Sequence, residues 1–83
     1  MNTALSPEMQ RCLDFVRRHG DQIYRHPGAF WAQKEWQPYT GEHFGTPTVE
    51  ALVKRQYLAY DLWQAGRYGK FPIKATLTEK GYP

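Results

Sequence analysis

The sequence predicts a small α+β domain with the element order α-β-β-α-β-β. Two segments open with a hydroxyl residue followed by proline and then repeat apolar residues at the spacing of an amphipathic helix. Each of these segments is followed by two short runs of strand character that are joined by a turn containing glycine. With 83 residues the chain has room for one domain, and we expect residues 1–83 to form it, with residues 1–5 frayed.

The first helix is expected to begin after Ser6 and to run to about His19. The Ser6 side chain can accept a hydrogen bond from the free amides of the first turn, and Pro7 suits the first helical position. Gly20 is the type of residue that follows a helix end. One face carries apolar residues at helical spacing, with Phe15 on its flank: Met9, Cys12, Leu13 and Val16.

A short β-hairpin is expected next, formed by residues 22–25 and 29–32. Between these runs, Pro27 supplies a fixed φ and Gly28 supplies the positive φ of a type II turn. Residues 33–45 lack periodicity and contain proline and glycine, so we expect a loop with at most one short turn of helix.

Thr46 and Pro47 open the second predicted helix in the same manner as Ser6 and Pro7, so Thr46 is expected to cap it. Its buried stripe is expected to contain three residues and to continue into the core through Leu58: Val49, Leu52 and Val53. The opposite face and its flanks hold the remaining side chains: Pro47, Thr48, Glu50, Ala51, Lys54 and Arg55.

A second hairpin is expected to pack on the helices, because its two strands have matching apolar faces. The alternating apolar residues are Leu58, Tyr60 and Leu62 on the first strand, and Ile73, Ala75 and Leu77 on the second. The connection, residues 64–70, is rich in glycine and basic residues.

Residues 46–81 combine the second helix, the basic hairpin and the closing sequence Leu77-Thr78-Glu79-Lys80-Gly81. In this order they resemble the recognition helix and wing of winged helix-turn-helix regulators such as the MarR and PadR families. The resemblance covers under half of the chain, and a fold does not determine which molecule its surface binds. It implies a small winged-helix-like domain that binds double-stranded DNA, as a regulatory or accessory protein of a bacterium, a phage or another mobile element. These regulators place a scaffold helix before the recognition helix, and this sequence has no apolar helical pattern there.

The charge distribution agrees with an anionic partner. The net charge is +3, and residues 46–83 account for all of it, with six Lys/Arg against three Asp/Glu. Residues 1–45 hold five of each. A basic balance of this size supports nucleic-acid binding without requiring it.

The candidate DNA contacts fall on the second helix and on the wing tip. Lys and Arg neutralise phosphate charge, and hydroxyls at a helix start can donate to phosphate oxygens. The alternative is an ordinary solvated surface, and Glu50 favours it for the helix, because a carboxylate repels phosphate. The candidates are Thr46, Thr48, Lys54 and Arg55 on the helix, and Arg67, Tyr68 and Lys70 at the tip.

A second hypothesis is a protein-interaction module that binds no DNA. Trp36 and Tyr39 lie in the aperiodic segment and could form an aromatic binding surface. Trp31 and Phe44 are expected to close the core instead, since aromatic residues dominate the packing of small domains.

Metal binding and catalysis are disfavoured. The three histidines share no metal-ligand spacing, and the chain has one cysteine, so we expect no metal site and no disulfide. We find no paired nucleophile and base and no glycine motif that cradles phosphate, so we expect no enzymatic activity and no cofactor. Cys12 lies on the apolar stripe of the first helix and is expected to be a buried, inert thiol.

The N-terminal residues have no basic region and no apolar run of the kind found in signal peptides, and no segment approaches the roughly 20 apolar residues of a membrane span. The single cysteine suits a reducing compartment, so we expect a soluble cytoplasmic protein. The sequence shows no dimer helix after Gly81, and we therefore expect a monomer or a weak homodimer.

Overall fold

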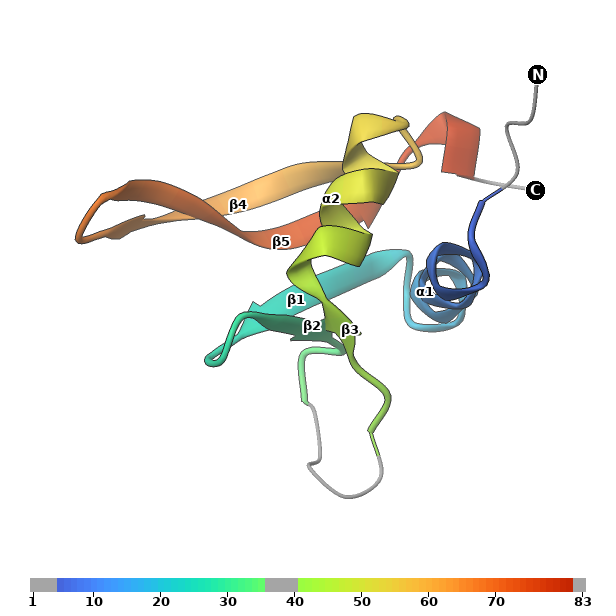
Figure 1. Ribbon diagram of the computed structural model, residues 1–83, viewed down its shortest axis with the longest axis horizontal. Coiled ribbons are helices and arrows are strands. Elements are labelled where there is room, and N and C mark those ends of the chain that lie inside the picture. The colour runs from blue at the N-terminus through green and yellow to red at the C-terminus, as the bar shows by residue number, and fades with distance from the viewer. Residues whose placement is uncertain (1–4, 36–40, 82–83) are drawn as a thin grey trace.

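The computed structural model describes residues 5–35 and 41–81 (Figure 1). These residues form a small α+β domain with two α-helices and a five-stranded antiparallel sheet. The elements in chain order are α1 (Pro7–Arg18), β1 (Gln22–His26), β2 (Phe30–Ala32), β3 (Phe44–Gly45), α2 (Thr46–Lys54), β4 (Leu58–Gly66), β5 (Gly69–Leu77) and the 3₁₀ turn η1 (Glu79–Gly81). Neither of the helices in the described ranges is long and apolar enough to cross a membrane.

The predicted order α-β-β-α-β-β is wrong by one strand. Phe44 and Gly45 form β3, which pairs with β2 through Trp31↔Phe44 and Phe30↔Gly45. A strand of two residues is too short to produce an alternating pattern, so β3 could not be predicted from local periodicity. The first helix, the first hairpin and the second helix agree with the prediction in type and place.

The sheet has the order β3-β2-β1-β5-β4, which leaves β4 at one edge. β1 supports only the inner part of β5, because their pairing covers Gln22↔Thr76 to Tyr24↔Lys74. β4 and β5 continue to pair with each other as far as Gly66↔Gly69. The outer part of this hairpin, which we call the wing, therefore projects beyond the rest of the sheet (Figure 1).

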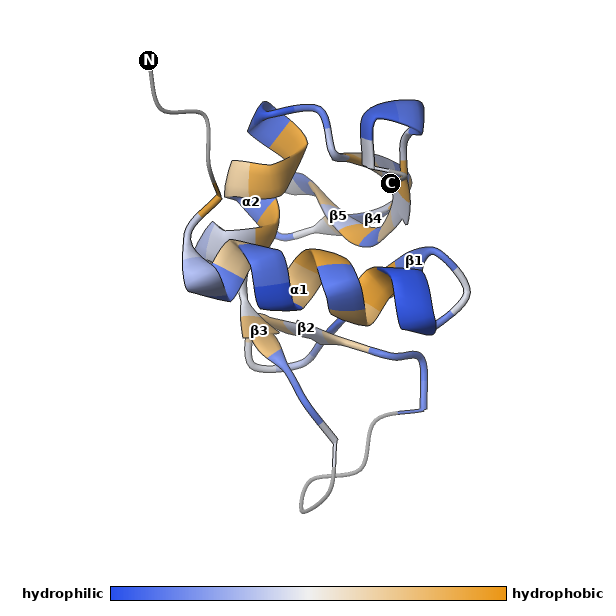
Figure 2. Cartoon of the chain, turned by 90° about the vertical axis from the view of Figure 1, so that its right-hand side faces the viewer, coloured by the Kyte–Doolittle hydropathy of each residue, from blue (hydrophilic) through white to orange (hydrophobic). Residues whose placement is uncertain are grey.

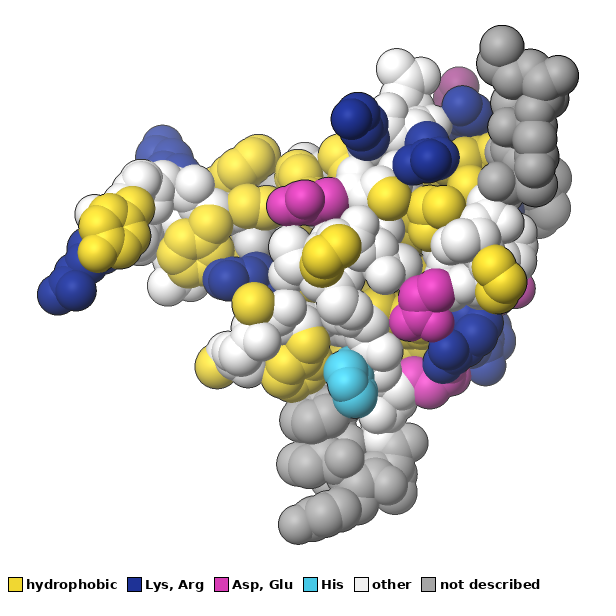
Figure 3. Space-filling view, in the orientation of Figure 1, with side chains coloured by type: hydrophobic (Ala, Val, Ile, Leu, Met, Phe, Trp, Pro, Cys, Tyr) yellow, Lys and Arg dark blue, Asp and Glu magenta, His cyan; other side chains and the backbone are white. Residues whose placement is uncertain are grey.

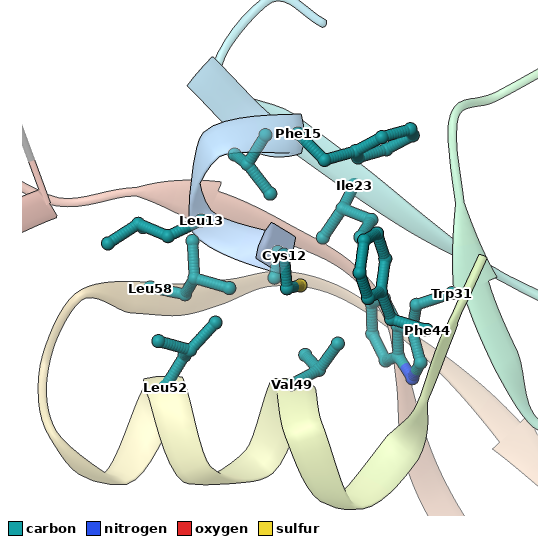
Figure 4. Packing of buried hydrophobic residues seen from close by; sticks show 11 residues of the cluster. Cys12, Leu13, Phe15, Ile23, Trp31, Phe44, Val49, Leu52 and Leu58 are labelled. Carbon is teal, nitrogen blue, oxygen red and sulfur yellow. The ribbon is translucent and has the colours of Figure 1, made fainter. Parts of the chain in front are cut away.

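The core lies between the two helices and one face of the sheet. Figure 4 shows Val49 and Leu52 pointing from α2 toward Cys12 of α1. Trp31 and Phe44 close one end of this core and are 0% and 1% exposed, as predicted. The remaining members of the cluster are also buried: Leu13, Phe15, Val16, Ile23, Leu58 and Ala75.

α1 begins and ends as the sequence predicts. The Ser6 hydroxyl accepts a hydrogen bond from the Met9 amide at 3.2 Å, and Pro7 occupies the first turn. At the other end, Gly20 has a φ of +78°, and the Asp21 amide donates to the Val16 carbonyl at 2.9 Å. Figure 2 shows that hydrophilic residues cover much of the outward side of α1.

Thr46 does not cap α2, contrary to the prediction. The cap residue is Gly45, whose position at the end of β3 brings the helix start directly against the first hairpin. Thr46 is already helical, and its hydroxyl donates to the Ala29 carbonyl at 2.8 Å and accepts from Trp31 Nε1 at 3.3 Å. The hydroxyl therefore joins α2 to the hairpin.

The regular alternation predicted for β4 fails at Leu62. Leu58 is buried and Tyr60 is half-buried, but Leu62 is 47% exposed. The pairing with β5 shifts on both sides of Leu62, which displaces its side chain from the apolar face. The turn is also tighter than the predicted connection over 64–70, because only Arg67 and Tyr68 lie between the last paired residues, Gly66 and Gly69.

Candidate nucleic-acid interface

The wing tip presents two basic side chains and one aromatic ring. Arg67 and Tyr68 are the central residues of the turn, and Lys70 follows at the start of β5. Tyr68 is 95% exposed, the highest value among the large hydrophobic residues that the structure describes. β4 runs from Leu58 in the core to Gly66 beside the turn, eight residue steps that correspond to about 26 Å. Figure 3 shows Lys and Arg side chains gathered at this outer end of the molecule.

The positive charge of the tip is not neutralised within the described part of the chain. Neither Arg67 nor Lys70 forms an ion pair or a side-chain hydrogen bond there. Asp61 is the single acidic residue between positions 58 and 77, and it pairs with Lys74 at 3.1 Å. The hydrogen bond that Lys74 donates to Asp61 raises the pKa of the Lys74 ammonium, so Lys74 keeps its charge beside Asp61. The tip keeps both of its charges.

α2 presents a weaker basic surface than the sequence suggested. Lys54 is exposed, but Glu50 is exposed on the same helix one turn earlier. The Arg55 guanidinium donates to the Ala51 carbonyl at 3.2 Å, and this bond satisfies a carbonyl at the helix end. Thr48 is half-buried, and the Thr46 hydroxyl is engaged by the first hairpin.

The seven predicted DNA-contacting residues do not form one continuous patch. Thr46 and Thr48 lie at the start of α2, beside β3, whereas Lys54 and Arg55 lie at its other end, close to where β4 begins. Arg67, Tyr68 and Lys70 lie at the far end of the wing (Figure 1). The structure brings together the residues of the tip and separates them from those of the helix.

Trp36 and Tyr39, the residues predicted for a protein interface, lie outside the described residues. The structure instead shows an aromatic row that the sequence analysis missed. Trp31 contacts Tyr60 with ring centroids 6.1 Å apart, and Tyr60 contacts Trp63 at 5.5 Å. Trp63 is 53% exposed, so the row runs from the core to the surface of the wing beside exposed Leu62. The shift in pairing at Leu62 could not be foreseen from the alternation.

A second feature missed by the sequence analysis is a pocket of about 180 Å³ between the wing and the β1–β2 turn. The Arg25 guanidinium lies there, 4.6 Å from the centroid of the Phe71 ring. Arg25 is two residues from buried Ile23 and so lies on the same face of β1. An arginine on the apolar face of a strand is the signal that could have identified it. The pocket is lined by Arg25, His26, Pro27, Gln64, Phe71 and Ile73.

The closing sequence Leu77-Thr78-Glu79-Lys80-Gly81, which carried much of the resemblance, has a structural role. The Thr78 amide donates to the Tyr57 carbonyl at 3.1 Å, and the Thr78 hydroxyl donates to the Gln56 carbonyl. The Arg17 Nε atom donates to the Gly81 carbonyl at 2.9 Å, which joins α1 to the end of the chain's last turn. These bonds fasten the base of the wing to the helices.

Cys12 is fully buried, as predicted, and burial with the nearby Glu8 charge raises the pKa of its thiol to about 12. At neutral pH it is therefore a protonated and unreactive side chain. Among the residues that the structure describes, no three His, Cys, Asp or Glu side chains are grouped to hold a metal ion.

No family model, curated protein or solved structure matches this chain. The surfaces described above are therefore the basis on which a function can be proposed.

Proposed function

We propose that this protein is a winged-helix-like domain that binds double-stranded DNA, with the wing tip as its main contact and α2 as a secondary one. A regulatory or accessory role follows from such binding. The observation that carries the proposal is the wing tip, where Arg67 and Lys70 flank the fully exposed ring of Tyr68 and have no acidic partner in the described chain.

The tip has the chemistry and the shape for a DNA groove. A two-stranded ribbon can enter the major groove, and a narrower tip can follow the minor groove or the backbone. Arg67 and Lys70 would release condensed counterions by neutralising phosphates, and Lys54 of α2 adds a third charge. Three phosphate contacts imply a salt slope of about −2.7 in a plot of log affinity against log salt concentration. Glu50 limits how closely α2 can approach the same duplex.

The test compares two double variants that change the net charge by the same amount. Arg67→Ala with Lys70→Ala is expected to weaken binding to a mixed-sequence duplex and to reduce the steepness of the salt slope by about 1.8. The control, Arg11→Ala with Arg18→Ala, removes two exposed arginines of α1, which lies at the opposite end of the molecule (Figures 1 and 2). If the two double variants bind alike, the wing tip is not the contact.

The second candidate function is a protein-interaction module. Leu62 and Trp63 are half-exposed on the edge strand β4, and apolar surface of this kind is enriched at protein interfaces. Such an interface depends much less on salt than DNA binding does. A wild-type protein that fails to bind the duplex at low salt would favour this candidate.

A further inference from the structure

The pocket beside the wing contains the cationic side chain of Arg25, which contacts an aromatic ring of the wing. Arg25 is half-buried, and its guanidinium lies over the Phe71 ring, with 4.6 Å between the guanidinium carbon and the ring centroid. A cation–π contact supplies no oxygen acceptor, so the N–H donors of the guanidinium keep their hydrogen-bonding capacity. Figure 3 shows the notch between the wing and the β1–β2 turn where this pocket lies.

Arg25 has no acceptor for these donors in the described ranges. It makes neither an ion pair nor a hydrogen bond there, although it is half-buried. By contrast, Arg11, Arg17, Arg18 and Arg55 each donate to a carboxylate or a carbonyl. A partly desolvated guanidinium without an acceptor is unfavourable. An anion that entered the pocket would supply acceptors for the N–H donors of Arg25.

The lining of the pocket favours an oxyanion. None of its six residues is acidic, and the Gln64 side-chain amide adds a second donor near Arg25. The planar fork of arginine suits a phosphate, which it can bind through two parallel hydrogen bonds.

We propose that this pocket receives a backbone phosphate of the duplex that the wing tip binds, an inference that rests on the proposed DNA binding. Phe71 directly follows Lys70, and Gln64 is three residues before Arg67, so the pocket lies about 7 to 10 Å along the wing from the tip. One DNA strand carries a phosphate about every 3.4 Å of helix axis. Pocket and tip therefore face phosphates that are only a few nucleotides apart on one strand.

The experiment titrates a mixed-sequence duplex into isotope-labelled protein and follows two signals. The Gly69 backbone amide reports on the tip, and the Gln64 side-chain amide reports on the pocket without being mutated. Both signals are expected to shift and to saturate together in the wild type.

In Arg25→Gln the Gln64 shift is expected to be lost while the Gly69 shift remains. The affinity for the duplex is expected to fall roughly threefold to tenfold, and the salt slope to become shallower by about 0.9. Arg25→Lys keeps the charge and is expected to lie between the two, because it loses the planar fork of N–H donors. Backbone spectra of both variants check that the fold is retained.

The outcomes separate the two proposals. A duplex that shifts Gly69 and leaves Gln64 unmoved, with Arg25→Gln binding as the wild type does, overturns the pocket assignment while DNA binding by the tip stands. Absence of duplex binding at low salt overturns both. A Gln64 shift produced by an acidic peptide, and not by the duplex, also overturns the assignment and identifies a carboxylate of a protein partner as the ligand.

Discussion

Gly81 lies against the connection between α2 and β4. A Cβ atom at this position would lie 2.5 Å from the Tyr57 carbonyl oxygen and 2.6 Å from Leu77 Cδ1. The Tyr57 carbonyl belongs to the backbone and cannot rotate aside as a flexible side chain can. The η1 turn would therefore have to move, and it would lose its hydrogen bonds to α1 and to the base of the wing.

We therefore expect Gly81→Ala to lower the free energy of unfolding by about 1 to 3 kcal/mol, measured by chemical denaturation. Gly45→Ala is the control, since its added Cβ atom meets no atom closer than 3.5 Å and its φ of −74° suits alanine. It should cost less than about 1 kcal/mol, the loss of a glycine cap. Equal losses in the two variants would contradict the steric explanation.

Cys12 gives the fold a dependence on alkaline pH. Burial raises the pKa of its thiol from 9.0 to about 12, so the folded chain keeps the proton where the unfolded chain loses it. The stability due to this group is complete below pH 9.0 and falls as the pH rises toward 12. Burial also raises the pKa of Tyr60, which acts in the same direction.

The expected result is that the wild type loses more unfolding free energy than Cys12→Ala when the pH rises from about 8 to about 10.5. Denaturant titrations at the two pH values measure both losses, and Tyr60 contributes equally to each protein. A loss of the same size in Cys12→Ala would show that the thiol does not ionise on unfolding in this range.

At the scale of elements, one side chain links α2 to the first hairpin. The Thr46 hydroxyl is the acceptor of Trp31 Nε1, and Trp31 is fully buried. Without that hydroxyl the indole N–H has no acceptor among the described residues, and a buried donor left unsatisfied costs about 1 to 3 kcal/mol.

Thr46→Val, which keeps the shape of the side chain, is accordingly expected to destabilise the protein by about 1 to 3 kcal/mol in thermal or chemical unfolding. Thr48→Val makes the same chemical change two residues later, at a half-buried threonine with no side-chain hydrogen bond in the described chain. This control should change stability by less than about 0.5 kcal/mol. A reversed order of the two effects would contradict the link.

The elements that the sequence predicts well are those with strong local signals. Ser6-Pro7 marks the start of α1, and Pro27-Gly28 marks the first turn, where Gly28 has a φ of +99° and the Ala29 amide donates to the His26 carbonyl. The features that it missed depend on contacts between distant segments. β3 exists because two residues pair with β2, and the local pattern at Thr46 is the same for a cap as for a first helical residue.

The candidate site was predictable only in part, for a similar reason. The basic residues of the turn, Arg67 and Lys70, follow from glycine placement and charge alone. The pocket around Arg25 could not be foreseen in full, because it joins β1 to a wing position more than 35 residues later through a pairing register that the sequence does not specify.

At the scale of the whole molecule, the longest axis measures 40 Å, with the wing at one end and α1 toward the other (Figure 1). Lys74 neutralises Asp61 at the base of the wing, so Arg67 and Lys70 at the tip face no acidic residue on the hairpin. Few basic groups are available for contact, so under the proposed function one copy of the chain should bind DNA with modest affinity and with a salt slope set by these few contacts.

The most direct test is the salt dependence of duplex binding by the wild type and by Arg67→Ala with Lys70→Ala. With Arg25 as a fourth phosphate contact beside Lys54, Arg67 and Lys70, we predict a log-log slope of about −3.6 for the wild type, falling to about −1.8 in the variant, with backbone amide shifts centred on the wing tip. Binding that is absent at low salt, or that is insensitive to salt and unchanged by the two substitutions, would contradict it.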